Sequence, residues 1–388
     1  MKFPKKLLCA ATAISIVLNI GVTAFAEESD ENAPDIMGAK AAIVTECTTG
    51  QVLYESGAKQ RLPIASVTKL MCLLIWAEEI EAGRLSFDDI VTCTAHANSM
   101  DGSVIWLETG EQMTAGELIK SVVIASANDA CVALCEHISG TEEAFVNRMN
   151  KRAAELGMND TQYRNCVGFD DSEHYSTAYD IAILCAEVSK YDIYDEFYAT
   201  RLDYVREGER QTQLLNTNKM MQYYSGIMGG KTGTTDGAGC CLAVWAKKGS
   251  MTLCAVELGC TESEQRFDIC ENLLDYGFNG FEVFKAKADS SQLSPIPVEN
   301  GIEKQVDIRV KRLMTAIIPR GKSSKVEYEY TVSEGLTAPV DYGQVVGTVT
   351  ATLDGEEIFR SDIVTVYEVE ELTFIKSLWI IICEIFKI

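Results

Sequence analysis

The chain has 388 residues, 47% of them hydrophobic, and it carries a formal net charge of -23. This length allows two domains with substantial cores. A nucleic-acid partner is not expected, because phosphate binding requires a basic surface. The acidity alone indicates no particular substrate.

The N-terminus predicts an export signal over residues 1–26. A lysine-containing start precedes an almost wholly apolar run, residues 7–22, and an Ala-Phe-Ala sequence ends at residue 26, directly before two glutamates. This order is typical of a cleaved secretory signal. A retained membrane anchor is the alternative. Residues 27–37 are then expected to form a linker.

Residues 38–280 are predicted to form one domain of the α+β class, with an antiparallel sheet and a sizeable helical block. Two strands joined by a Thr-Thr-Gly turn are expected at 38–57. Further along, the patterns predict helices over 64–83, 116–140 with a break near Ser126, 141–157, 176–190 and 262–276, and a β-hairpin over 239–259.

The chain contains 14 cysteines, which in an exported protein would normally suggest disulfides. Removing the leader leaves an odd number, and many of the rest stand inside apolar runs, so we interpret them mainly as small buried hydrophobic residues. His96, His137 and His174 are far apart in sequence, and Cys-x-x-Cys is absent. A metal site is therefore not expected.

Residues 281–369 consist of short strand patterns separated by turns, which predicts a separate β domain. The last segment, 370–388, predicts an amphipathic helix with a wide apolar face. Lys376 and Glu384 interrupt the apolar run, so the segment is too short to span a bilayer and should lie in the membrane interface. The alternative is a helix packed on the β domain.

Ser66 and Lys69 form a Ser-x-x-Lys motif at the head of an apolar run. Positions i and i+3 share a helix face. In the first turn the serine N–H is not used by the helix, and the helix dipole favours a neutral lysine that can take the serine proton. Alone the motif is weak, since a helix cap followed by a surface lysine has the same spacing.

Two further motifs follow. Ser126 and Asn128 stand at the expected interruption between two helices, where buried polar groups would need partners, although both residues could simply cap the second helix. Lys231, Thr232 and Gly233 stand on the strand before the hairpin, and the glycines there would let another backbone approach. The alternative is a glycine turn with a solvated lysine.

The order Ser-x-x-Lys, Ser-x-Asn, Lys-Thr-Gly is the signature of penicillin-binding proteins and serine β-lactamases. The sequence resembles the low-molecular-mass penicillin-binding proteins, which are serine-type D-alanyl-D-alanine carboxypeptidases, from about residue 38 to the C-terminus. The similar segments include "RLPIASVTKLM", "SANDACVALCEHISGTEEAFVNRMN", "HYSTAYDIAIL" and "GGKTGTTDGAGCCLAVWAKKG". The sequence departs from the family pattern at "RNCVGFDD", residues 164–171, and members differ at Thr234.

The resemblance implies a penicillin-binding, β-lactamase-like transpeptidase domain, then a small β domain and a membrane-anchoring helix. In this family the serine at position 66 is acylated and Lys69 is its base. Ser126 relays the proton to the leaving D-alanine and is held by Lys231. No cofactor is implied.

The resemblance also implies substrate-binding positions. Asn128 would contact the substrate peptide, and Gly233 would lie beside it. The backbone N–H groups of Ser66 and Thr234 would form the oxyanion hole. Thr232, and also Thr234, would contact the terminal carboxylate. Arg266 is a further carboxylate-binding candidate, with a surface arginine as the alternative.

The expected partners are peptidoglycan stem peptides, β-lactams as covalent inhibitors and the membrane surface, at the outer face of the cytoplasmic membrane. Two other functions stay open: a serine β-lactamase, and a catalytically silent wall-binding protein. Release of D-alanine from a pentapeptide would separate the three.

Overall fold

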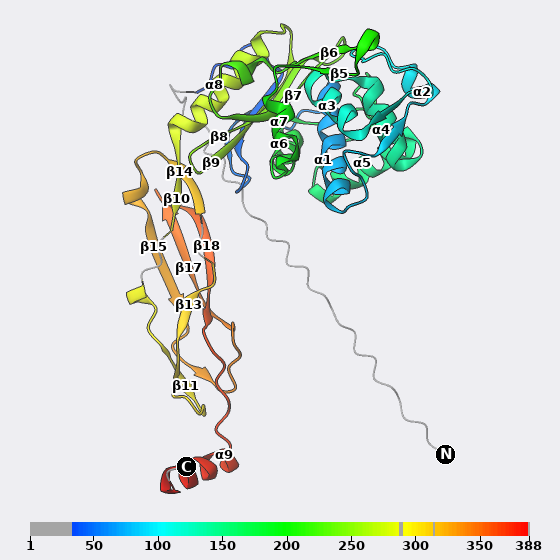
Figure 1. Ribbon diagram of the computed structural model, residues 1–388. Coiled ribbons are helices and arrows are strands. Elements are labelled where there is room, and N and C mark those ends of the chain that lie inside the picture. Colours follow the sequence, from blue (N-terminus) through cyan, green and yellow to red (C-terminus); the bar gives the residue numbers. More distant parts are fainter. Residues whose placement is uncertain (1–32, 287–289, 313–314, 387–388) are drawn as a thin grey trace, which may run out of the picture.

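The computed structural model describes residues 33–286, 290–312 and 315–386. The predicted export signal, residues 1–26, lies outside this part of the chain. The described chain begins with a layered α and β part and continues into an elongated β part, which ends in a separate helix far from the first part (Figure 1).

The first part is built on a five-stranded antiparallel sheet with the order β2-β1-β9-β8-β7. The two strands predicted near the start of the chain form one edge, and the strand that carries the Lys-Thr-Gly motif forms the other. The five strands are β1 (Ala41–Glu46), β2 (Val52–Ser56), β7 (Ile227–Thr235), β8 (Gly239–Lys248) and β9 (Met251–Cys260).

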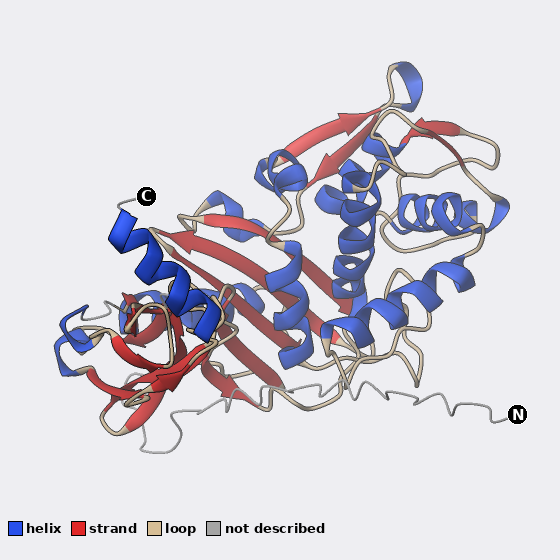
Figure 2. Ribbon diagram, turned by 90° about the horizontal axis from the view of Figure 1, so that it is seen from below, coloured by secondary structure: helices blue, strands red, loops and turns tan. Residues whose placement is uncertain are grey.

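Both faces of this sheet are covered, which explains its nearly continuous apolar strands. Along β9, Cys254 and Val256 join the core under the helical block, whereas Leu253 and Ala255 join the core under α8 (Gln265–Gly280). This alternation follows from the period of two in a strand. Figure 2 shows helices beside the main sheet and across it.

The helical block surrounds α1 (Lys69–Glu81), most of whose side chains are buried. Threonines cap four of the described helices through their side-chain oxygens: Thr94 for α2, Thr114 for α3, Thr141 for α5 and Thr177 for α6. The other elements of this part are α2 (Ala95–Asn98), α3 (Ala115–Ala125), α4 (Asn128–Ser139), α5 (Glu142–Leu156), α6 (Ala178–Val188), α7 (Asp195–Ala199), β3 (Ile90–Thr92), β4 (Gln112–Thr114), β5 (Leu202–Val205) and β6 (Thr212–Leu215), with 3-10 turns η1 (Ala65–Thr68), η2 (Asp192–Tyr194), η3 (Gly208–Arg210) and η4 (Lys219–Gln222).

The helix predicted at 64–83 requires a correction at its start. Residues Ala65–Thr68 form the 3-10 turn η1, and the α-helix begins only at Lys69. The predicted break near Ser126 is confirmed, because α3 ends at Ala125 and α4 begins at Asn128.

The second part contains small sheets with the orders β10-β14, β12-β11-β16 and β13-β18-β17-β15. Ile317 packs into the core beneath α8, and Gln51 Nε2 donates to its carbonyl oxygen at 3.0 Å, so the two parts are in contact. The elements are β10 (Phe281–Lys285), η5 (Ser290–Gln292), β11 (Ile296–Glu299), β12 (Gln305–Val306), β13 (Ile308–Val310), β14 (Thr315–Pro319), η6 (Ser323–Lys325), β15 (Glu327–Val332), β16 (Leu336–Thr337), β17 (Val345–Leu353) and β18 (Glu356–Thr365).

The C-terminal helix α9 (Phe374–Phe386) lies at the end of the β part that is remote from the main sheet (Figure 1). Its large apolar side chains are exposed: Phe374, Ile375, Leu378, Trp379, Ile381 and Ile385. The helix therefore does not bury this face on the β part. Within the described residues, no helix is both long and apolar enough to cross a membrane.

Candidate active site

Ser66 stands in the turn η1, directly before α1. Ala65, the preceding residue, has a φ of +46°, a conformation that non-glycine residues rarely adopt and that is concentrated at functional sites. Ser66 is half-buried, while Ala65 and Val67 on either side are buried. The turn thus anchors its neighbours in the core and leaves the serine hydroxyl accessible.

Lys69 is fully buried, and its Nζ has three oxygen partners. These are Ser66 Oγ at 2.7 Å, Asn128 Oδ1 at 2.7 Å and the Val167 carbonyl oxygen at 3.0 Å. The last two can only accept hydrogen bonds, whereas a hydroxyl can also donate. Nζ donates to all three oxygens, and Ser66 Oγ in turn donates to the Val167 carbonyl oxygen at 3.3 Å. A neutral amine would instead keep the N–H bonds to Asn128 and Val167 and accept the Ser66 proton.

The environment of Lys69 favours this neutral form. Burial lowers the pKa of its amine below the usual value, and the neighbouring cysteines, Cys131 first among them, oppose that shift. A buried base with a lowered pKa beside a hydroxyl is the arrangement that activates a serine nucleophile.

The loop that supplies the Val167 carbonyl was not assigned a role from the sequence. It belongs to the segment 164–171, noted there only as a departure from a family pattern. Gly168 has a φ of +90°, and a Cβ atom at this position would lie 1.9 Å from the carbonyl oxygen of Ala65. Glycine therefore lets the loop reach the turn that carries Ser66, and this required glycine was the available signal.

Ser126 and Lys231 form a second hydroxyl–amine pair. Lys231 is buried, and its Nζ donates to Ser126 Oγ at 2.9 Å and to the Thr232 carbonyl oxygen at 2.9 Å. Burial, followed by repulsion from Lys69 and Arg266, holds the pKa of Lys231 well below its usual value. Ser126 has a φ of +62°, which ends α3 and turns its side chain toward β7.

Asn128 does not cap the second helix, as the alternative reading of the motif had allowed. The N-cap of α4 is Ala127, without a side-chain cap, and the Asn128 amide instead joins two segments. Its Oδ1 accepts from Lys69, and its Nδ2 donates to the carbonyl oxygen of Asp101 at 2.7 Å. The residue thus connects the lysine with the loop before α3.

The Lys-Thr-Gly strand passes close to the serine. A Cβ atom on Gly233 would lie 2.9 Å from Ser66 N and 2.8 Å from the Ile64 carbonyl oxygen, so only glycine permits this approach. Thr232 Oγ1 donates to Thr217 Oγ1 at 2.8 Å. The sequence did not single out Thr217, because nothing in its local pattern marks it.

Arg266 comes from α8 on the other side of the sheet and reaches the same strand. Its Nη1 donates to Thr234 Oγ1 at 3.0 Å and to the Gly233 carbonyl oxygen at 3.1 Å. The side chain is 8% exposed, so the alternative of a surface arginine is wrong. Lys231 and Arg266 thus place an amine and a guanidinium along the strand that carries Thr232 and Thr234.

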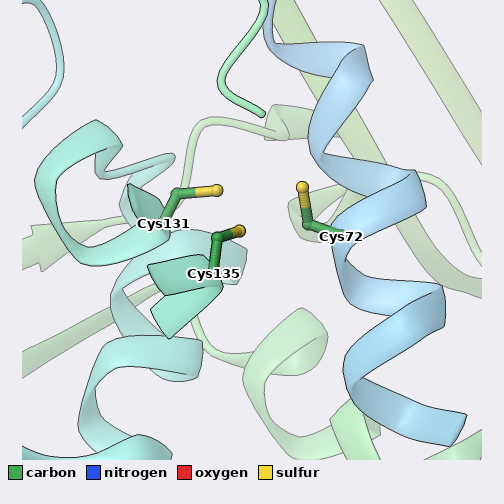
Figure 3. Close-up of side chains that lie close together, drawn as sticks. All are labelled: Cys72, Cys131 and Cys135. Carbon is green, nitrogen blue, oxygen red and sulfur yellow. The ribbon is translucent and has the colours of Figure 1, made fainter. Parts of the chain in front are cut away.

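Three buried cysteines lie beside Lys69. Cys72 is one turn further along α1, and Cys131 and Cys135 lie on α4; their Sγ atoms are all within 4.8 Å of one another (Figure 3). The sulfurs of Cys72 and Cys131 both donate to the Cys166 carbonyl oxygen, at 3.2 and 3.5 Å. Although the spacing could accommodate a metal ion, two of the three have partners as protonated thiols, and we interpret the group as packing.

The geometry brings together two hydroxyl–lysine pairs, the Asn128 amide and the strand that carries Thr232 and Thr234. Family models match most of the chain: D-alanyl-D-alanine carboxypeptidase over residues 27–262, and the C-terminal domain of penicillin-binding protein 5 over residues 281–371. The second match agrees with the predicted all-β part.

Similar proteins span almost the same length. The chain is 35% identical to the D-alanyl-D-alanine carboxypeptidase DacF of Bacillus subtilis, over 96% of this chain and 97% of that protein. It is 33% identical to DacC of Escherichia coli, over 92% and 90%.

Among solved structures, penicillin-binding protein 5 from Haemophilus influenzae superposes with a TM-score of 0.78 at 30% identity, over 87% of this chain and 99% of that one. PBP3 from Streptococcus pneumoniae, described as a peptidoglycan synthesis regulatory factor, gives a TM-score of 0.68 at 28% identity, over 86% and 99%. The chain therefore belongs to the D-alanyl-D-alanine carboxypeptidase family, and it is a cell-wall hydrolase of the penicillin-binding type.

Proposed function

We propose that this protein removes the terminal D-alanine from peptidoglycan stem pentapeptides through an acyl-enzyme on Ser66. The observation that supports this most strongly is the contact of Ser66 Oγ with the buried amine of Lys69 at 2.7 Å, because it pairs a nucleophile with a base whose pKa is lowered by burial.

In the acylation step, the Ser66 hydroxyl gives its proton to Lys69 Nζ, and Oγ bonds to the carbonyl carbon of the penultimate D-alanine. The carbonyl oxygen takes up the negative charge, and the backbone N–H groups of Ser66 and Thr234 are the proposed donors to it. Gly233 supports this role, because it allows the strand to lie against Ser66 N.

Collapse of this intermediate breaks the C–N bond, and the leaving D-alanine nitrogen must receive a proton. We assign that transfer to Ser126, which passes on the proton that Lys69 took up and whose hydroxyl is held by Lys231 at 2.9 Å. Lys69, neutral again, then accepts a proton from the water that attacks the ester carbon, and it returns this proton to Ser66 Oγ as the ester bond breaks. No cofactor enters this sequence.

The free carboxylate of the substrate is assigned to the strand β7. Thr232 and Thr234 offer hydroxyl groups there, Arg266 supplies positive charge beside Thr234, and the Lys231 amine adds an N–H donor. Asn128 is assigned to the substrate peptide. To bind it, the Asn128 amide must give up its hydrogen bond with Lys69 or with the Asp101 carbonyl oxygen. β-Lactams, whose amide resembles the scissile bond, would acylate the same serine.

D-Alanine release from a pentapeptide tests this function. The wild-type protein should release one D-alanine per peptide, while Ser126→Ala should retain its fold and lose most of the release. Rapid turnover of benzylpenicillin without release of D-alanine from the pentapeptide would identify a β-lactamase and contradict the proposal.

We also propose that the protein is exported and held at the outer face of the cytoplasmic membrane by α9. The support is the set of exposed apolar side chains on that helix, among them Phe374, Trp379 and Ile385. Lys376 pairs with Glu370 at 2.5 Å near the start of the helix. The net charge of the chain is strongly negative, so apolar burial rather than charge would hold it.

Deleting residues 372–388 should release a soluble protein with unchanged turnover on a small peptide. A full-length variant with Leu378→Ser and Ile381→Ser is the matched control, and it should also leave the membrane fraction. If the shortened protein still sedimented with membranes, the anchor would be elsewhere, most simply an uncleaved N-terminus. If it were soluble but inactive, the helix would belong to the catalytic fold.

A further inference from the structure

Trp106 combines exposure with an unfavourable backbone conformation. Its φ is +55° and its side chain is 70% exposed, whereas its neighbours Ile105 and Leu107 are 1% and 2% exposed. A bulky aromatic residue is a rare occupant of the left-handed region, and it stays there only when the surroundings determine the backbone strongly. The exposed indole buries little apolar surface, so burial does not offset the cost of this backbone conformation.

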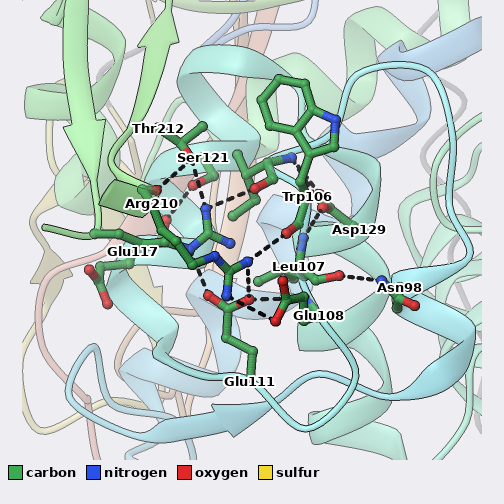
Figure 4. Close-up of polar contacts among 12 residues, drawn as sticks. Asn98, Trp106, Leu107, Glu108, Glu111, Glu117, Ser121, Asp129, Arg210 and Thr212 are labelled. Carbon is green, nitrogen blue, oxygen red and sulfur yellow. Dashed lines mark hydrogen bonds and ion pairs between the residues drawn. The ribbon is translucent and has the colours of Figure 1, made fainter. Parts of the chain in front are cut away.

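The surroundings of Trp106 do determine its backbone. The buried carboxylate of Asp129 accepts the N–H of Ile105 at 3.1 Å and the N–H of Leu107 at 2.9 Å, one on each side of the tryptophan. Figure 4 shows the indole pointing away from these contacts. Asp129, in the first turn of α4, therefore fixes the conformation of this loop.

Two arginines between β5 and β6 hold the carbonyl groups of the same segment. Arg210 Nη2 donates to the Trp106 oxygen at 3.1 Å, and Arg206 Nη1 donates to the Ile105 oxygen at 2.8 Å. Both arginines pair with Glu111, at 2.6 Å for Arg206 and 3.1 Å for Arg210. Several contacts thus hold the strained residue in one place.

This loop also contacts Asn128, a residue of the candidate active site. The backbone N–H of Asn128 donates to the Ser103 oxygen at 2.6 Å, and its side chain donates to the Asp101 oxygen at 2.7 Å. Asp129, which holds the loop around Trp106, is the next residue on α4. The chain from Ser103 to Trp106 can extend about 10 Å at most.

We propose that Trp106 is the contact surface for the aliphatic part of the stem peptide on the N-terminal side of the D-Ala-D-Ala bond. A peptide that is cleaved at Ser66 and contacts Asn128 would lie beside this loop, which accepts two hydrogen bonds from Asn128. A rigid, exposed indole suits such a side chain, because aromatic surfaces bind apolar groups with little loss of conformational freedom. The proposal rests on the proposed carboxypeptidase function, and it adds a binding surface outside the reacting groups.

The test compares substrates that extend to different lengths on the N-terminal side of the cleaved bond. Trp106→Ala should raise KM for the pentapeptide about tenfold with kcat unchanged, because the contact is the same in the ground and transition states. Cleavage of N-acetyl-D-alanyl-D-alanine and acylation by benzylpenicillin should be unchanged. Trp106→Phe should recover most of the loss. Tyr342→Ala is the matched control, since Tyr342 is 65% exposed in the β part.

A second variant separates binding from folding. Trp106→Gly removes the indole and also the unfavourable side chain in a left-handed conformation, so its melting temperature should equal or exceed that of the wild type. Its KM for the pentapeptide should nevertheless rise as in Trp106→Ala. A more stable protein with weaker peptide binding is the result that a purely structural role would not produce.

Three results would overturn the proposal. Equal KM values for wild type and both variants would show that the indole contacts no substrate. A loss confined to a disaccharide-linked pentapeptide would assign the indole to the glycan instead. A loss of benzylpenicillin acylation would show damage to the reacting groups. Retained acylation with unchanged KM would leave the proposed carboxypeptidase function intact and reject the Trp106 contact alone.

Discussion

The two parts of the molecule differ in what they bury. Among the described residues, buried acidic, lysine and arginine side chains lie only in the first part: Glu46, Lys69, Glu79, Asp129, Asp180, Lys231, Glu257 and Arg266. The buried polar residues after position 281 are Ser361 and Thr365. Removing charge from water is costly, so a fold retains such groups where they do chemistry or hold the groups that do.

The β part and the helix that follows it expose apolar side chains instead of burying ionisable ones. Its ion pairs are exposed, such as Arg360 with Glu357, and the unusual feature is apolar surface on the helix that follows it. An exposed apolar face indicates a partner surface. The first part is therefore distinguished by buried ionisable groups, and the second by exposed hydrophobic side chains.

Lys69→Arg should have the largest effect on activity. Arginine keeps the charge but cannot accept the serine proton, so acylation by benzylpenicillin should fall on the order of 10²–10⁴-fold. In the wild type, acylation should also fall as the pH drops through the lowered pKa of Lys69, since the ammonium form is no base. Stopped-flow acylation rates would show both. The same change at the exposed Lys311, in the β part, should leave the rate unaltered.

Gly168→Ala should be severely destabilising. The new Cβ would lie 1.9 Å from the Ala65 oxygen and would also occupy a backbone with φ of +90°. Gly157→Ala is the control, because its φ is +78° but its surroundings are open, so only the conformational cost of about 1–2 kcal/mol applies. Denaturant unfolding would compare them. Equal losses would mean that the loop moves away from the turn without cost.

Glu257 should make the stability of the first part depend on pH. Burial raises the pKa of its carboxyl from 4.5 to about 8, so folding favours the protonated form. The stability it contributes is complete below pH 4.5 and is lost as the pH rises toward 8. Glu257→Gln should therefore melt at a higher temperature than the wild type at pH 9, with a smaller difference at pH 5. Glu55→Gln, at an exposed position, should show no such trend.

Removing an ion pair of the β part should have the smallest effect. Arg360 and Glu357 are both well exposed, and solvent screens such pairs almost completely. Arg360→Ala should leave the melting temperature within experimental error at pH 7. A clear decrease would show that the β part depends on its surface charges and would weaken the contrast between the two parts.

The local elements of the fold could be predicted from the sequence because they depend on short-range patterns. The alternating and 3.6-residue periods located the hairpin of β8 and β9 and the break at Ser126. The pairing of β1 with β9 could not be derived in this way, since more than two hundred residues separate them. The start of α1 was misplaced because a 3-10 turn and a helix share the same local residue preferences.

The reacting side chains were also predictable, because the family motifs name them. What the motifs omit is backbone: the Val167 carbonyl oxygen carries no side-chain signal, yet it orients Lys69. Arg266 was a predicted candidate, but its contact with Thr234 depends on the packing of α8 against the sheet, which a local sequence pattern does not reveal. The roles of these residues remain proposals.

Mass mapping after treatment with benzylpenicillin tests the central claim, that Ser66 is the nucleophile and Lys69 its base. The account predicts one covalent adduct per molecule, on the peptide that contains Ser66, and none in Ser66→Ala. It also predicts that folded Lys69→Arg forms this adduct far more slowly. An adduct on any other residue, or labelling of Ser66→Ala at the wild-type rate, would contradict the account.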